Sequence, residues 1–145
     1  MSAIDSAQSY ADPVGTKPTW FTVEQANRAL PLVRRIAADV VNQYAELERL
    51  QKQRSALLSQ GRRSAAEKIK QQALLVIDRL KDLTGELRAI GCHLMDLQGG
   101  LVDFPGRRNS QEVFFCWKPG EPRVLYWHDL HAGFASRRPL DDACR

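Results

Sequence analysis

An apolar seam in the middle of the chain constrains the fold more than any other sequence feature. Its side chains recur at alternating steps of four and three residues without interruption, at Ile69, Ala73, Val76, Leu80, Leu83, Leu87 and Ile90. This spacing places them on one face of an α-helix and is typical of a helix that packs nearly antiparallel to another or in a coiled coil. The chain must therefore provide a long apolar surface to cover this face.

A second amphipathic stretch, from Pro31 to about Gln60, is the partner that the seam requires. Its apolar positions follow the same steps, at Val33, Ala37, Val40, Tyr44 and Leu47. Leu74 and Ile77 broaden the stripe of the later helix into a second contact line. Because that line lies beyond the seam used inside the hairpin, it predicts that two hairpins pack as a four-helix dimer.

Local signals place the start of the first helix. Thr22 and Gln25 have the spacing of a capping box, so the helix is expected to begin at Val23. Pro31 has no backbone N–H, and its ring clashes with the carbonyl of Asn27. We therefore expect a short helix that bends at Pro31 into a long one.

The signals between and after the helices complete the hairpin. Gly61 should end the first helix, and Ser64 with Glu67 forms a second capping box that should start the next. Gly91 should close the second helix in a left-handed conformation. The pattern predicts an antiparallel helical hairpin over residues 19–91 with helices roughly 40 Å long at 1.5 Å per residue.

After Gly91 the apolar pattern changes to a period of two, which indicates strands. Val113–Trp117 and Arg123–His128 read as a β-hairpin with its turn at Gly120. Leu101–Phe104, bounded by glycine and proline, supplies a third strand. A small antiparallel sheet needs one face covered, and the helical hairpin is the available cover. The expected fold is α+β and mostly α.

The expected organisation is a leader over residues 1–18 and a single domain over 19–145, with a β-rich segment at 92–140 and a tail at 141–145. The 43% of hydrophobic residues is enough to bury a core. No apolar run approaches the roughly 20 residues of a membrane-spanning helix, and the N-terminal residues do not resemble a secretory signal. Three cysteines are an odd, sparse set that fits reduced thiols. We therefore expect a cytoplasmic protein without membrane association.

The net charge of +4 is concentrated in the middle of the chain, where residues 51–90 hold nine Lys and Arg against four acidic residues. A candidate contact for RNA or another polyanion is the group Arg62, Arg63, Lys68 and Lys70. A solvated turn explains the same charges, since no aromatic residues interleave with them to stack on bases. Nucleic-acid binding is therefore the weaker possibility.

Phrases in the C-terminal half carry a family resemblance. They are Gly100-Leu101-Val102-Asp103-Phe104-Pro105, Cys116-Trp117, Gly120-Glu121-Pro122, Tyr126-Trp127-His128, Gly133-Phe134 and Arg138-Pro139-Leu140, and Ala26-Asn27 with Leu30-Pro31 fit as well. Over roughly Phe21 to Leu140 the chain resembles the bacterial family catalogued as domain of unknown function 2203. The resemblance implies a helical hairpin followed by a small β-rich segment, and it implies no activity.

The polar residues of these phrases form the candidate site. They are Asp103, Glu121, His128 and Arg138, with Arg137 able to share the role of Arg138. Two carboxylates, an imidazole and a guanidinium can bind a divalent metal, or an anionic ligand through the arginine. They can equally hold the sheet together as satisfied buried polar groups. The cofactor and the metal, if any, cannot be named from the sequence.

The spacing of soft ligands disfavours a structural zinc site. No Cys-x-x-Cys pair is present, and in a strand the three-residue step from His128 to His131 does not bring both imidazoles to one face. Cys116 alternates within an apolar strand and so is expected to be a small buried apolar group.

Two functions remain open. The first is a non-catalytic interaction module in which the hairpin supplies a rigid self-association surface, so that the protein forms a dimer or binds another protein. The second is a small-ligand or metal-binding protein, or an enzyme, with its site in the β-rich segment. Six aromatic residues between Phe114 and Phe134 divide between two faces of the sheet. The outer face is either an interaction surface or is covered by the C-terminal segment.

Overall fold

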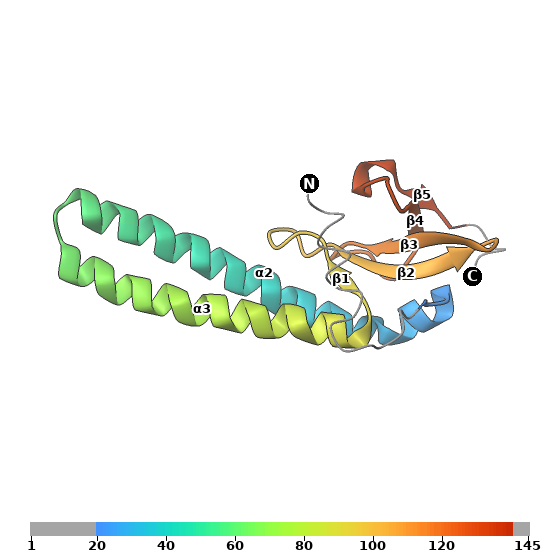
Figure 1. The fold of residues 1–145 in the computed structure, drawn as a ribbon, viewed down its shortest axis with the longest axis horizontal. Helices are drawn as coiled ribbons and strands as arrows, with labels where there is room; N and C mark the ends of the chain where they lie inside the picture. The colour runs from blue at the N-terminus through green and yellow to red at the C-terminus, as the bar shows by residue number, and fades with distance from the viewer. Residues whose placement is uncertain (1–19, 141–145) are drawn as a thin grey trace.

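The computed structural model describes residues 20–140, so the expected leader and the tail at 141–145 lie outside the described residues. Two long helices, α2 (Val23–Ser59) and α3 (Arg63–Ile90), precede a five-stranded sheet (Figure 1). The strands are β1 (His93–Leu94), β2 (Val102–Arg108), β3 (Gln111–Trp117), β4 (Tyr126–Asp129) and β5 (Arg138–Pro139), with a 3₁₀ turn, η1, at Phe134–Ser136. The α+β fold predicted from the sequence is confirmed.

The start of α2 follows its sequence signals. The Thr22 hydroxyl accepts the backbone N–H of Gln25 at 3.0 Å, and the Gln25 side chain accepts that of Thr22 at 2.9 Å. The helix continues through Pro31 as one element, with its first turns inclined to the rest (Figure 1). Pro31 therefore bends α2 without dividing it into two helices.

The predicted capping box at Ser64 and Glu67 is wrong. The residue that precedes α3 is Arg62, which makes no side-chain capping bond. Gly61 adopts a positive φ of 73°, and the N–H of Arg62 bonds the carbonyl of Leu57, so the turn closes early. Ser64 therefore already lies in the first turn of α3. At the other end, Gly91 adopts the predicted left-handed conformation, with φ 111°.

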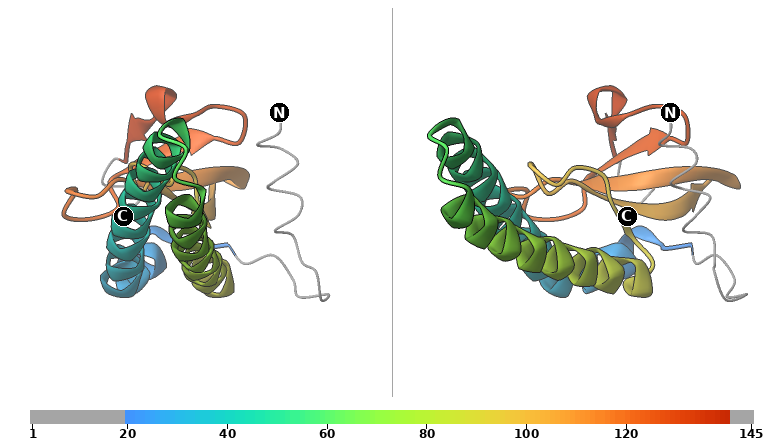
Figure 2. Two further views of the ribbon diagram at one scale, coloured as in Figure 1. Left: turned by 90° about the vertical axis from the view of Figure 1, so that its left-hand side faces the viewer. Right: turned by 60° about the vertical axis from the view of Figure 1, so that its left-hand side comes forward.

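The two helices pack along their predicted apolar faces. Residues from both lie in one buried cluster with the inner face of the sheet, among them Val33, Ala37, Val40, Leu80, Leu83 and Leu87. The sheet covers only one end of the hairpin, and the end that carries the α2–α3 turn projects away from it (Figures 1 and 2). No helix within residues 20–140 is long and apolar enough to cross a membrane.

The sheet is antiparallel throughout, in the order β1-β2-β3-β4-β5. The predicted β-hairpin is β3 with β4, and the predicted third strand is β2, which continues to Arg108. Asn109 and Ser110, both with positive φ (53° and 67°), form the two-residue turn that joins β2 to β3. The sheet has five strands where three were predicted, because β1 and β5 are only two residues long and carry no recognisable period.

Strand alternation gives the sheet two different faces. Val102 and Phe104 of β2 and Phe115 and Trp117 of β3 are buried in the core shared with the helices. The intervening side chains of β2, β3 and β4 lie on the opposite, outer face. The segment that contains η1 lies over this face, away from the helices (Figure 1). Of the two alternatives for the outer face, the structure therefore shows cover by the C-terminal segment.

Candidate functional site

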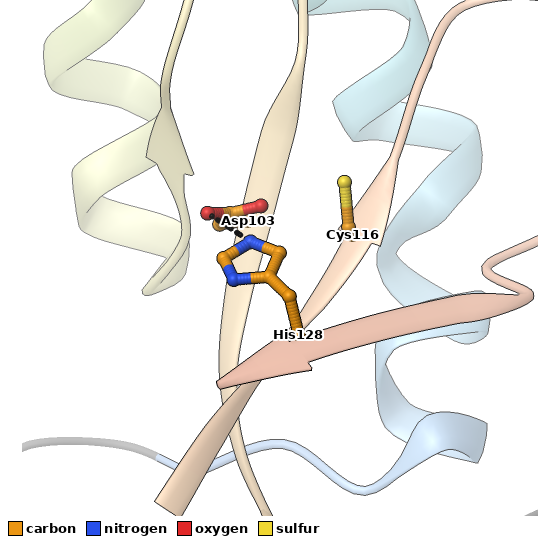
Figure 3. Close-up of side chains that lie close together, drawn as sticks. All are labelled: Asp103, Cys116 and His128. Atoms are coloured by element: carbon orange, nitrogen blue, oxygen red, sulfur yellow. Dashed lines mark hydrogen bonds and ion pairs between the residues drawn. The ribbon is translucent and has the colours of Figure 1, made fainter. Parts of the chain in front are cut away.

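Three polar side chains meet on the outer face of the sheet, each from a different strand. Asp103 lies on β2, Cys116 opposite it on β3, and His128 on β4 (Figure 3). One ligating atom from each lies within 4.8 Å of the other two. Their exposed fractions are only 2%, 1% and 4%. We call these residues the outer-face cluster.

His128 holds a fixed orientation within the cluster. Its Nδ1 lies 2.9 Å from the carbonyl oxygen of Asp129, which can only accept, so Nδ1 carries a proton. Its Nε2 lies 3.0 Å from Oδ2 of Asp103. Burial disfavours the charged imidazole, but the hydrogen bond and the charge of Asp103 outweigh burial, so the pKa of His128 lies above its ordinary value.

Cys116 is buried, as expected, but it has a polar neighbour that the sequence did not reveal. Its Cα is paired with that of Asp103 across β2 and β3, which brings its thiol beside the carboxylate. Burial raises the pKa of this thiol to about 12; the charge of Asp103 adds to the rise and the nearby Arg137 guanidinium opposes it. The thiol is thus protonated at neutral pH and is not an activated nucleophile.

The other predicted carboxylate, Glu121, lies in a second polar group. It forms a bidentate ion pair with Arg137, which the sequence had placed second to Arg138. The guanidinium of Arg137 lies between the rings of Tyr126 and Phe134, at 3.9 and 4.1 Å from their centroids. This contact fastens the C-terminal segment over the outer face. Arg138 is exposed and stacks on Trp127 from outside.

The structure therefore separates the four predicted site residues. Asp103 and His128 contact each other directly, Glu121 pairs with Arg137, and Arg138 joins neither group. His93, on β1, lies opposite Asp103 in register, and the negative charge of Asp103 acts to raise the pKa of His93. Burial lowers the pKa of His93 more than Asp103 raises it, and Arg88 lowers it further.

The two best-defined hollows on the described surface do not open onto the outer-face cluster. These hollows, of about 230 and 400 Å³, are lined by residues around Met95 and around Trp20. Neither is lined by Asp103, Cys116 or His128. A substrate-sized molecule therefore has no route to the cluster through either hollow.

The four basic residues proposed for polyanion binding are all exposed near the α2–α3 turn. Arg62 and Arg63 lie at the turn itself, and Lys68 and Lys70 follow in α3. Two residues along a helix correspond to about 200°, so these lysines point to opposite flanks of α3. The group is a charged tip with no continuous flat surface, and polyanion binding stays a prediction.

The face of α3 opposite the seam is open to solvent. Leu74 and Leu75 on this side are 45% and 70% exposed, whereas Ile77 packs partly buried against the core. Ile77 therefore does not belong to the predicted second contact line; Leu74 is its exposed apolar residue, and Leu75 lies about 100° further round the helix, at the edge of this face. The exposed residues spaced around Leu74 on its side of the helix, which we call the outer face of α3, are Glu67, Lys70, Gln71, Leu74, Asp78 and Lys81.

The fold and the buried polar cluster define an α+β protein with a projecting helical hairpin and a sheet covered on both faces. The chain belongs to the family of uncharacterized conserved proteins DUF2203, whose model matches residues 19–140. The family resemblance predicted from the C-terminal phrases is thereby confirmed. No curated protein and no solved structure matches the chain.

Proposed function

We propose that this protein is a non-catalytic cytoplasmic interaction module that self-associates through the outer face of α3. The observation that carries the proposal is the pair Leu74 and Leu75, which are solvent-exposed in the middle of a rigid helix. The hairpin projects beyond the sheet, so a second hairpin can approach this side without meeting the sheet (Figure 2). Packing two hairpins there gives a four-helix arrangement that covers Leu74 and brings Leu75 to the edge of the contact.

The charges around Leu74 favour a second copy of this chain as the occupant. Glu67 and Lys81 lie seven residues to either side of Leu74, and Lys70 and Asp78 lie four to either side. In an antiparallel pair of α3 helices with its two-fold axis at Leu74, Glu67 faces Lys81 of the second copy and Lys70 faces Asp78. Each of these two oppositely charged pairs therefore occurs twice in the dimer, which sets the direction and register of the helices.

Two features support a role without catalysis in the cytoplasm. The outer-face cluster is buried, and its thiol has a raised pKa, so it offers neither an accessible nucleophile nor a place for substrate. Cys92 and Cys116, both buried within residues 20–140, are free thiols, as is usual in a reducing compartment.

The first test is the subunit count of the untagged protein by native mass spectrometry and analytical ultracentrifugation over a concentration series. We expect a dimer that dissociates on dilution in the micromolar range, since few apolar side chains drive the contact. Leu74→Glu should give a monomer with an unchanged circular dichroism spectrum. Leu32→Glu is the matched control, because Leu32 is a helical leucine of similar exposure, 49%, on α2.

A charge exchange tests the register. Lys81→Glu places two like-charged pairs in the dimer and should weaken association about tenfold, because each exposed pair is worth up to about 1 kcal/mol. Adding Glu67→Lys to the same chain restores both pairs and should restore association. A protein that stays monomeric at every concentration contradicts self-association, and a double variant no better than Lys81→Glu contradicts this register.

A further inference from the structure

The outer-face cluster combines the three ligand types that a borderline-soft metal prefers. Asp103 offers a carboxylate oxygen, Cys116 a sulfur and His128 an imidazole nitrogen, and these atoms lie within 4.8 Å of one another. They come from the three central strands, whose register is fixed by continuous pairing on both sides of β3. The geometry thus does not depend on a mobile loop or on a single helix end.

The orientation of His128 points to a cation. Since Nδ1–H donates to the carbonyl of Asp129, a neutral imidazole turns the lone pair of Nε2 toward Oδ2 of Asp103, only 3.0 Å away. Two lone pairs at that distance repel unless a proton or a metal ion lies between them. A backbone carbonyl that holds Nδ1–H is also the usual support of a metal-binding histidine, because it aims Nε2 at the metal.

We propose that Asp103, Cys116 and His128 bind a single zinc ion, and that the ion ties β2, β3 and β4 together beneath the C-terminal segment. Zinc binding displaces the Cys116 thiol proton and the proton held between Asp103 and His128 into solvent, so the apparent affinity should rise with pH. The resulting thiolate and neutral imidazole exclude Mg²⁺ and Ca²⁺, which require oxygen ligands, and favour Zn²⁺. The cluster is almost completely buried, so a bound ion would have little contact with solvent, which fits a structural role. The zinc site stabilises the sheet and is independent of the proposed self-association through α3.

His93 is the candidate for the fourth position of a tetrahedral site. Its ring nitrogens are not among the atoms that lie within 4.8 Å of one another, so its side chain would have to turn toward the ion. His93 lies directly opposite Asp103 across β1 and β2, and therefore on the same face of the sheet. The charge of Asp103 acts on the pKa of His93, which also places the two side chains near each other. The short strand β1 would then be held to the sheet by the metal as well as by its two residue pairs.

The test begins with wild-type protein stripped of metal by a chelator and then titrated with Zn²⁺ or Co²⁺ alone. We expect one equivalent of either ion to bind. Zinc in hundredfold excess over its Kd should raise Tm by about 10 °C. Bound Co²⁺ should show visible bands of tetrahedral coordination and a near-ultraviolet sulfur-to-cobalt charge-transfer band. Wild-type protein that binds neither ion, or binds Co²⁺ without the charge-transfer band, overturns the proposal without any variant.

Variants then assign the ligands. Cys116→Ser should abolish the charge-transfer band, and His128→Gln should weaken zinc binding at least a hundredfold, whereas His93→Gln should weaken it less. Cys92→Ser is the matched thiol control, since Cys92 is equally buried but bonds the Leu87 carbonyl in the core. His131→Gln is the control for an exposed histidine. Unchanged binding in Cys116→Ser and His128→Gln would show adventitious metal only and overturn the assignment.

Discussion

At the scale of single residues, a buried ion pair joins His128 and Asp103. Removing two charges from water is costly, and their attraction recovers that cost only with good geometry and further hydrogen bonds. The Asp129 carbonyl provides one such bond to His128. Without metal, the pair must share a proton, so the state of the cluster depends on pH.

The raised pKa of His128 predicts how the metal-free protein responds to pH. The folded protein holds this proton more tightly than the unfolded chain, whose histidines titrate near ~6.5. The stability from His128 is therefore complete below that pH and is lost as pH rises through the folded-state pKa. His93 acts in the opposite sense, since its lowered pKa costs stability as pH falls.

Thermal unfolding in the presence of chelator separates the two histidines. The difference in Tm between wild type and His128→Gln should be largest below the ordinary histidine pKa of about 6.5 and should shrink as pH rises through the higher folded-state pKa of His128. Asp103 and Cys116 face His128 from the neighbouring strands, and the thiol stays protonated throughout this range because its pKa is about 12. A difference that grows with pH would contradict the proposed protonation of the pair.

At the scale of the elements, the β2–β3 pair positions the cluster, and one close contact fixes its packing. Gly106 on β2 lies under the ring of Phe115, and a Cβ added there would lie 2.2 Å from a ring carbon. Phe115 is buried in the core, so the ring has little room to move. Gly106→Ala should therefore lower the free energy of unfolding by about 2 kcal/mol.

Chemical denaturation measures this cost, with Gly133→Ala as the control. A Cβ at Gly133 would have no neighbour within 4 Å, so that change should be within about 0.5 kcal/mol of wild type. If both variants unfold at the same denaturant concentration, the contact between Gly106 and Phe115 does not limit packing.

The helices were more predictable than the site because their signals are local. The seam from Ile69 to Ile90 and the cap at Thr22 can each be read within a few turns. Cys116 meets Asp103 only through the register of β2 and β3, which the Asn109–Ser110 turn sets. That turn lacks the Asn-Gly signature, so its register could not be predicted from the sequence. The residues next to Cys116 in the sequence are apolar, so they give no sign that its side chain lies beside a carboxylate. Asp103 and His128 were predicted to share a site, but the inclusion of Cys116 and the separation of Glu121 and Arg138 were not predicted.

At the scale of the whole molecule, the two proposed sites lie on different elements. The outer-face cluster lies on the sheet, on its face away from the helices (Figure 3), and the exposed residues of the outer face of α3 belong to the hairpin, which makes no contribution to the cluster. Arg137 fastens the C-terminal segment over the cluster through Glu121 and two rings, and none of these residues belongs to α3. Changes at the two sites should therefore be additive.

Because the two sites are separate, a substitution at either one should remove only the property that belongs to it. Leu74→Glu should remove the dimer and leave the zinc affinity of each chain within about twofold of wild type. His128→Gln should remove zinc and leave the dimer dissociation constant equally unchanged, because the helices pack on the inner face of the sheet and keep their own core. The zinc affinity and the dimer dissociation constant should be measured in each single variant and in the double variant, which gives a double-mutant cycle. A zinc affinity that falls with dimer dissociation would show that the sheet and the hairpin are coupled, contrary to the separation argued from their faces.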